Sequence, residues 1–202
     1  MDEKIRAFVA VKLPLELTDM LGDVQSGLKK ISGGEKAINR AVSWVKPENI
    51  HLTLKFLGHV EKHLIEKIIA GLEVVSSTHG PFKLTTAGVG GFPGLKNPRV
   101  LWLGILESVP LTRLWRDIEQ RLKALGLEPA IEDEKRGFKP HLTLCRIKSV
   151  QAGGVLAEGA GHLTHIATMD FTVDSIVLFK SVLSPAGARH EEIKRISLKG
   201  VQ

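Results

Sequence analysis

The sequence predicts an α+β fold with two similar lobes, related by a pseudo-twofold axis that runs between two copies of one tetrapeptide. Residues 51–54 and 141–144 both read His-Leu-Thr-Leu. In the first half of the chain, strand-like and helix-like segments alternate as strand, helix, strand, helix, strand, and the second half approximately repeats this order. We therefore expect a single two-lobed domain over residues 1–202, with the approximate lobe boundary in segment 88–98.

Strands are expected where apolar and β-prone residues cluster between turn signals. The first cluster is stopped by Pro14, and we expect Gly58 to end the strand that begins with the first tetrapeptide. Segment 88–98 contains four glycines and two prolines, which predicts a long loop. The expected strands lie at residues 5–11, 41–45, 51–57, 81–87, 99–105, 141–144, 170–180 and 192–198.

Helices are expected where apolar residues recur at spacings of three and four. The first such stripe consists of Leu17, Leu21, Val24, Leu28 and Ile31, and Gly33-Gly34 interrupts the pattern. The spacing predicts helices at residues 15–31, 61–77 and 110–125, and a weaker one near 150–158.

The composition is that of an ordinary globular protein, with 43% hydrophobic and 25% charged residues. A formal charge of +6 favours anionic partners without distinguishing RNA from a nucleotide or an acidic protein. A single cysteine, Cys145, excludes an internal disulfide framework and fits a reducing compartment. The charged N-terminus leads directly into a strand, and no apolar run approaches the length of a membrane span. We expect a cytoplasmic protein without a signal peptide.

The two tetrapeptides predict a symmetric cleft. Side chains alternate along a strand, so His51 and Thr53 share one face, and so do His141 and Thr143. Imidazoles with pKa values near 6.5 can accept and donate protons at neutral pH, and threonine hydroxyls can hydrogen-bond an oxyanion. One base, one acid and two hydroxyl donors suit phosphoryl transfer without a metal or another cofactor.

Sequence context separates these two copies from a third near-copy, residues 162–165, which reads His-Leu-Thr-His and lacks a buried strand. A Lys-Pro pair precedes both accepted copies, and a basic residue follows each of them, Lys55 and Arg146. Alternation could also place Cys145 at the groove edge, although a small buried filler is the favoured interpretation. The alternative for both histidines is that they are partly exposed strand residues with incidental spacing.

Several stretches resemble one known family. They are the paired tetrapeptides, RAFVAV, WVKPENIHLTLKFLG, GVGGFPGLKNPRVLWLG and VLFKSVLSPAGARHEEI. Together they are similar to the RNA 2',3'-cyclic phosphodiesterases of the two-histidine phosphoesterase superfamily, first described as 2'-5' RNA ligases. The resemblance implies a bilobal fold in which antiparallel sheets line a central groove and helices cover the outer faces. It also implies hydrolysis of a 2',3'-cyclic phosphate to a 2'-phosphomonoester.

The resemblance further assigns roles to individual residues. It implies that His51 is the proton donor, that His141 is the proton acceptor, and that Thr53 and Thr143 hold phosphate oxygens. Arg146 matches a basic position of the family, but strict alternation from His141 points it away from the groove unless a bulge redirects it. Arg146 therefore ranks below the residues of the two tetrapeptides as a phosphate ligand. The family often has a tyrosine near the position of His190, whereas this chain contains no tyrosine.

These observations predict a metal-independent hydrolase that acts on RNA ends or nucleotides bearing a 2',3'-cyclic phosphate, works as a monomer and has no membrane partner. Two alternatives remain open at the level of sequence. One is a non-catalytic module that binds nucleotides or RNA ends. The other is reversible 2'-5' ligation of RNA as the main activity.

Overall fold

The computed structural model describes residues 3–31, 36–127, 137–162, 168–184 and 187–200. Its helices are α1 (Leu15–Ile31), α2 (Lys36–Ala41), α3 (Ile65–Ser76), α4 (Val109–Ala124) and α5 (Val150–His162), with short 3-10 helices η1 (Pro47–Asn49) and η2 (Lys62–Leu64). Its strands are β1 (Lys4–Lys12), β2 (Val42–Trp44), β3 (His51–Glu61), β4 (Phe82–Phe92), β5 (Val100–Ile105), β6 (His141–Ile147), β7 (Asp170–Val173), β8 (Ser175–Ser184) and β9 (Gly187–Ser197). Residues 163–165 of the rejected near-copy lie outside the described ranges.

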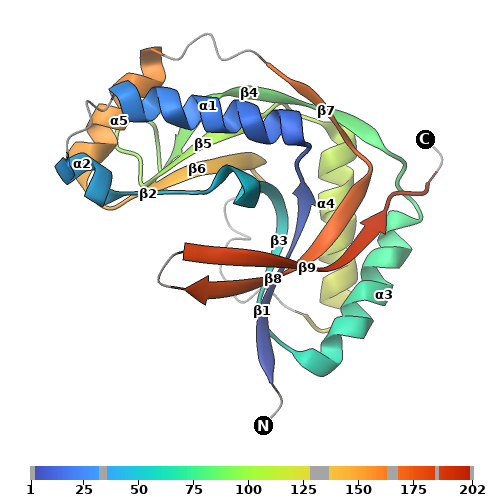
Figure 1. Cartoon of the computed structure of the whole chain (residues 1–202). Coiled ribbons are helices and arrows are strands. Elements are labelled where there is room, and N and C mark those ends of the chain that lie inside the picture. The colour runs from blue at the N-terminus through green and yellow to red at the C-terminus, as the bar shows by residue number, and fades with distance from the viewer. Residues whose placement is uncertain (1–2, 32–35, 128–136, 163–167, 185–186, 201–202) are drawn as a thin grey trace.

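The strands that the structure describes form one curled sheet in the order β7-β4-β5-β6-β3-β1-β8-β9, with β2 paired to β6 (Figure 1). Every pairing in it is antiparallel. The expected α+β class is confirmed, and the strands β7-β4-β5-β6 and β3-β1-β8-β9 join at the β3–β6 contact into a single sheet. The two tetrapeptides begin these two central strands.

The helices cover one face of this sheet, where the main hydrophobic core lies. Helices α3 and α4 pack on each other and reach β3, β8 and β9, while α1 packs on α5 and α5 reaches β6 (Figure 1). Each helix pair therefore combines one helix from before segment 88–98 with one from after it. A smaller cluster, formed by Phe8, Ala10, Val177 and Phe179, lies on the opposite face.

The expected helical stripes are largely confirmed. Leu17, Leu21, Val24 and Leu28 of α1 are buried, whereas Ile31 is 40% exposed. In α4 the buried residues repeat at the same spacing, and the Ser108 side chain caps the helix by accepting a hydrogen bond from the backbone N–H of Leu111. No helix in the described part of the chain is both long enough and apolar enough to cross a membrane.

Two expected element boundaries are wrong. Strand β3 does not end at Gly58 but continues to Glu61, which pairs with Lys4, and Gly58 takes a φ of 68° beside a bulge. Helix α3 consequently begins only at Ile65. Partner strands decide where these elements end, so local pattern alone misplaces the boundaries.

The glycine-rich segment also differs from the expected long loop, because β4 continues through Phe92 and pairs with β5. Gly90 faces Trp102 across these strands, and a Cβ atom at Gly90 would lie 2.1 Å from the indole ring. A glycine is thus required here for packing against a large side chain. The short helix α2 was not expected either, since its sequence has no clear apolar stripe.

Candidate active site

The two tetrapeptides meet at the junction of β3 and β6. Leu52 pairs with Leu142, and both side chains are fully buried in the main core. Extended by one residue, this antiparallel register sets His51 across from Thr143 and Thr53 across from His141. Since the leucines point towards the helices, the histidines and threonines share the opposite face. The side-by-side arrangement expected from the sequence is therefore present.

Both imidazoles are oriented in the same way by the backbone. The Nδ1 atom of His51 lies 2.8 Å from the carbonyl oxygen of Asn49, and that of His141 lies 2.7 Å from the carbonyl oxygen of Lys139. A carbonyl oxygen can only accept, so each Nδ1 carries a hydrogen and donates it. In the neutral rings Nε2 is then the basic atom. The two imidazoles thus share one tautomer, with the lone pair of the neutral ring on Nε2.

Burial keeps both rings neutral in the free protein. It lowers the pKa of His51 to about 4, against the opposing effect of the Asn49 hydrogen bond, and the neighbouring His190 and His141 lower it further. The pKa of His141 is also lowered, first by burial and then by the positive charges of Arg146 and Lys139. Neither imidazole is therefore mainly protonated at pH 7 before a ligand binds.

His51 has aromatic neighbours. Its ring stacks on Phe8 with centroids 4.7 Å apart, and Phe8 in turn stacks on Phe179 at 5.2 Å. His190 meets the ring of His51 edge-on at 5.1 Å. These contacts surround one side of His51 with apolar surface and a third imidazole.

His141 has aromatic and cationic neighbours. Phe92 meets its ring edge-on at 4.9 Å, and the centroid of Trp102 is 6.1 Å away. The ammonium of Lys139 lies over Trp102, 5.0 Å from the ring centroid. The environments of the two imidazoles therefore differ although their tetrapeptides are identical.

A β-bulge places Arg146 on the face of the sheet that carries His141. Trp102 of β5 pairs with Thr143, but the preceding Leu101 pairs with Cys145, so Leu144 is an extra residue in β6. Leu144 and Cys145 are both fully buried in the main core, and Arg146 is exposed on the face of His141. Strict alternation would have pointed Arg146 to the face opposite His141, and the bulge is the irregularity that redirects it.

The same bulge decides the position of Cys145. Its thiol is in the core, not at the groove edge, and burial raises its pKa to about 12. This agrees with the favoured interpretation of Cys145 as a buried filler. A thiol with so high a pKa is protonated at neutral pH and is a poor nucleophile.

A matching bulge follows the first tetrapeptide, because Ala10 pairs with Thr53 and Val9 pairs with Lys55. Lys55 is consequently 8% exposed on the helix side, where its ammonium lies 2.5 Å from Glu119 of α4. The two basic residues that follow the tetrapeptides are therefore not equivalent. Lys55 forms a structural ion pair, whereas Arg146 lies exposed on the face of His141.

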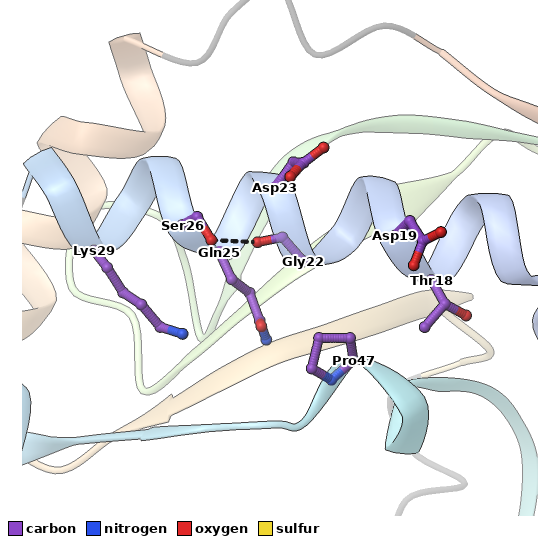
Figure 2. A pocket seen from close by; sticks show the side chains of 8 residues that line it. All are labelled: Thr18, Asp19, Gly22, Asp23, Gln25, Ser26, Lys29 and Pro47. Carbon is purple, nitrogen blue, oxygen red and sulfur yellow. Dashed lines mark hydrogen bonds between the residues drawn. The ribbon is translucent and has the colours of Figure 1, made fainter.

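Gln25 of α1 supports the bulge in β6. Its side-chain amide donates to the carbonyl oxygen of Leu144 at 2.8 Å and to that of Val45 at 2.7 Å. Figure 2 shows Gln25 pointing from α1 towards the strands, in a hollow between the helix and Pro47. The signal for it in the sequence is a polar residue four positions after Leu21, on the apolar stripe of the helix.

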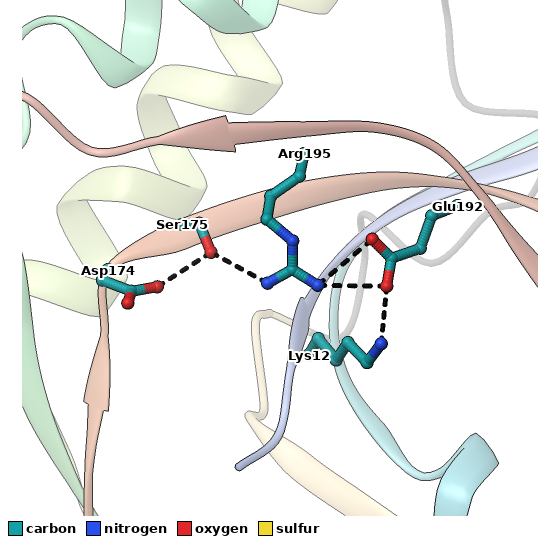
Figure 3. A network of polar contacts seen from close by, with 5 residues as sticks. All are labelled: Lys12, Asp174, Ser175, Glu192 and Arg195. Carbon is teal, nitrogen blue, oxygen red and sulfur yellow. Dashed lines mark hydrogen bonds and ion pairs between the residues drawn. The ribbon is translucent and has the colours of Figure 1, made fainter.

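The cations beside the two histidines differ in whether a carboxylate neutralises them. Lys12 pairs in register with His51, and its ammonium lies 2.6 Å from Glu192, which also pairs with Arg195 (Figure 3). Among the described residues, in contrast, neither Lys139 nor Arg146 has a carboxylate partner. Two cations without a carboxylate partner in the described part of the chain thus lie beside His141, whereas Lys12, the register partner of His51, is paired with Glu192.

Known sequences match this chain over nearly its whole length. The LigT-like phosphoesterase family matches residues 17–102 and 104–190, and each segment holds one tetrapeptide. The RNA 2',3'-cyclic phosphodiesterase of Methanothermobacter thermautotrophicus is 31% identical over 191 residues, covering 95% of this chain and 97% of that protein. The protein of the same name from Archaeoglobus fulgidus is 32% identical over 190 residues, covering 94% and 98% respectively.

Solved structures share the fold. A crystal structure of a protein from Thermus thermophilus superposes with a TM-score of 0.79 and 26% identity, covering 98% of this chain and all of that one. The structure of E. coli LigT in complex with 3'-AMP has a TM-score of 0.69 at 23% identity, over 97% of this chain and 99% of that one. Since each half of the chain contributes one tetrapeptide and each half matches the same family, this protein belongs to the LigT-like phosphoesterases.

Proposed function

We propose that this protein is an RNA 2',3'-cyclic phosphodiesterase that hydrolyses cyclic phosphate ends of RNA or nucleotides to 2'-phosphomonoesters without a metal ion. The observation that carries the proposal is the pairing of Leu52 with Leu142, which brings two identically oriented imidazoles to one face of the sheet. The names of the curated relatives support the choice of substrate.

In the proposed mechanism the cyclic phosphate lies between the two Nε2 atoms. Nε2 of His141 takes a proton from a water molecule, whose oxygen attacks the phosphorus. The bond between phosphorus and the 3' oxygen breaks, and Nε2 of His51 gives its proton to that oxygen. The products are a 3'-hydroxyl and a 2'-phosphate. The hydroxyls of Thr53 and Thr143 donate to the non-bridging oxygens, where negative charge increases in the transition state.

His51 takes up the proton that this mechanism requires from solvent when the substrate binds. The pKa of about 4 reflects a ring without a nearby negative charge. A phosphodiester anion within hydrogen-bond distance favours the protonated ring and raises its pKa. Arg146, on the face of His141, adds a positive charge for the same anion and is a weaker candidate for phosphate contact than the two threonines.

The test is product analysis after incubation with a 2',3'-cyclic nucleotide in the presence of EDTA. The expected product is the 2'-phosphate. His51→Ala and His141→Ala should each lower turnover by about 10²–10⁴-fold, as is typical for the loss of a general acid or base. His162→Ala, in the rejected near-copy, is the matched control and should keep the wild-type rate.

Other results would favour the other functions. Near wild-type rates in both His51→Ala and His141→Ala would refute the catalytic assignment. Tight binding of a 2'-nucleotide without any turnover would indicate a binding module. Faster consumption of cyclic-ended RNA when an RNA with a 5'-hydroxyl is added would indicate ligation as the main activity.

A further inference from the structure

His190 of β9 lies against the proposed proton donor. Its ring centroid is 5.1 Å from that of His51 with the planes at 88°, and it meets Phe8 edge-on at 4.9 Å. It pairs across the sheet with Ser181 of β8, the strand that contributes Phe179 to the small cluster. His190 thus lies beside His51 and is held by Phe8, on which His51 also stacks.

The two nitrogens of this imidazole have different environments. Nδ1 of His190 is buried and has no hydrogen-bond partner, whereas Nε2 is neither bonded nor buried and so reaches solvent. Leaving a buried N–H without an acceptor costs free energy, whereas an N–H that reaches water can donate a hydrogen bond to it. The hydrogen of the neutral ring therefore belongs on Nε2, and Nδ1 keeps a lone pair.

The ring also resists taking up a second proton. A protonated ring would place a charged N–H at the buried Nδ1 position. Burial and the positive charge of Arg6 both lower the pKa of His190. At pH 7 His190 is consequently neutral, with its N–H donor on Nε2.

We propose that His190 is a third substrate-binding imidazole, whose Nε2–H donates a hydrogen bond to an oxygen of the nucleotide bound beside His51. The inference rests on the proposed function, because that nucleotide is the cyclic phosphate substrate or its 2'-phosphate product. The acceptor is a phosphate or a ribose oxygen, since both are hydrogen-bond acceptors carried by the same ligand.

Two substitutions distinguish the contribution of the N–H donor from that of the aromatic ring. His190→Phe keeps an aromatic ring against Phe8 and removes the N–H, whereas His190→Tyr keeps a ring and restores a hydroxyl donor. His63→Phe is the control, because the His63 side chain is 57% exposed on η2. Dissociation constants for a 2'-nucleotide and for inorganic phosphate are measured by calorimetry, and kcat/KM is measured on a 2',3'-cyclic nucleotide.

His190→Phe should weaken nucleotide binding and lower kcat/KM by about tenfold each, the usual effect of losing one neutral hydrogen bond. His190→Tyr should recover most of both losses, and His63→Phe should change neither. A parallel loss of inorganic phosphate binding would identify a phosphate oxygen as the acceptor. A loss confined to the nucleotide would identify a ribose oxygen.

Nitrogen-15 NMR of the wild-type protein tests the tautomer independently of any variant. A hydrogen on Nε2 of a neutral His190 is expected at pH 7. A hydrogen on Nδ1, a charged ring, or full affinity and rate in a folded His190→Phe protein would overturn the inference. If the wild type turns over no cyclic phosphate, the proposed function fails, while the tautomer and the 2'-nucleotide affinities still decide the role of His190.

Discussion

Burial of His51 should make this protein lose stability in acid, by an amount that follows from the pKa. The pKa is about 4 in the folded protein and about 6.5 in an unfolded chain. As the pH falls below 6.5, the unfolded chain binds this proton first, so the equilibrium shifts towards unfolding. The loss is negligible above pH 7, grows as the pH falls towards 4 and then stays constant. Near pH 4.5 it amounts to about 2.5 kcal/mol.

Urea unfolding at pH 7 and pH 4.5 measures this effect when the wild type is compared with His51→Asn. The variant has no titrating group at this position, so it should lose about 2.5 kcal/mol less than the wild type over this interval. The carboxylates whose pKa values are lowered, such as Glu192, are present in both proteins and cancel in the difference.

Parallel losses of stability in the wild type and in His51→Asn would refute the reasoning. They would mean that the imidazole keeps an ordinary pKa in the folded protein and is well solvated. NMR titration of the His51 ring checks the same point directly. The ring should titrate near pH 4 in the free protein and at a higher pH when a 2'-nucleotide is bound, because the phosphate stabilises the charged form.

Three further predictions concern the other parts of the site. Because kcat/KM reports the pKa values of the free enzyme, the limb of its pH profile that is set by His141 should lie below pH 6.5, and Arg146→Gln should move that limb to higher pH. Gln25→Leu should cost about 2–4 kcal/mol in urea unfolding, because two carbonyl oxygens lose their side-chain donor. Cys145 should react with a thiol reagent only at the rate of unfolding, as absorbance at pH 8 would show, because its thiol is buried and its pKa is about 12.

Local patterns were sufficient for the parts of the site that depend on one strand at a time. The alternation of His51, Leu52 and Thr53 predicts which side chains share a face, and the buried Leu52–Leu142 pair agrees with it. Helical spacing likewise predicts the buried stripes of α1 and α4. In these cases the periodicity of the element and the burial of its apolar residues follow from the same sequence pattern.

Features that depend on a partner strand could not be predicted in this way. A bulge changes which face every later residue occupies, and nothing within β6 itself distinguishes Leu144 from an ordinary strand residue. Arg146 and Cys145 therefore exchange faces relative to strict alternation. The donor that satisfies the bulge, Gln25, comes from a helix more than a hundred residues earlier in the chain, and only the fold brings the two together.

The different surroundings of two identical tetrapeptides support different roles for their histidines. Burial lowers both pKa values, but Lys139 and Arg146 add positive charge only beside His141. When a phosphate anion binds between the rings, it favours a proton on either of them, and the cations oppose this at His141. In the free protein the pKa of His51 is lowered to about 4 and that of His141 is lowered less, so the proposed roles require the bound anion to raise the pKa of His51 above that of His141. NMR titration of both rings with a bound 2'-nucleotide tests this order.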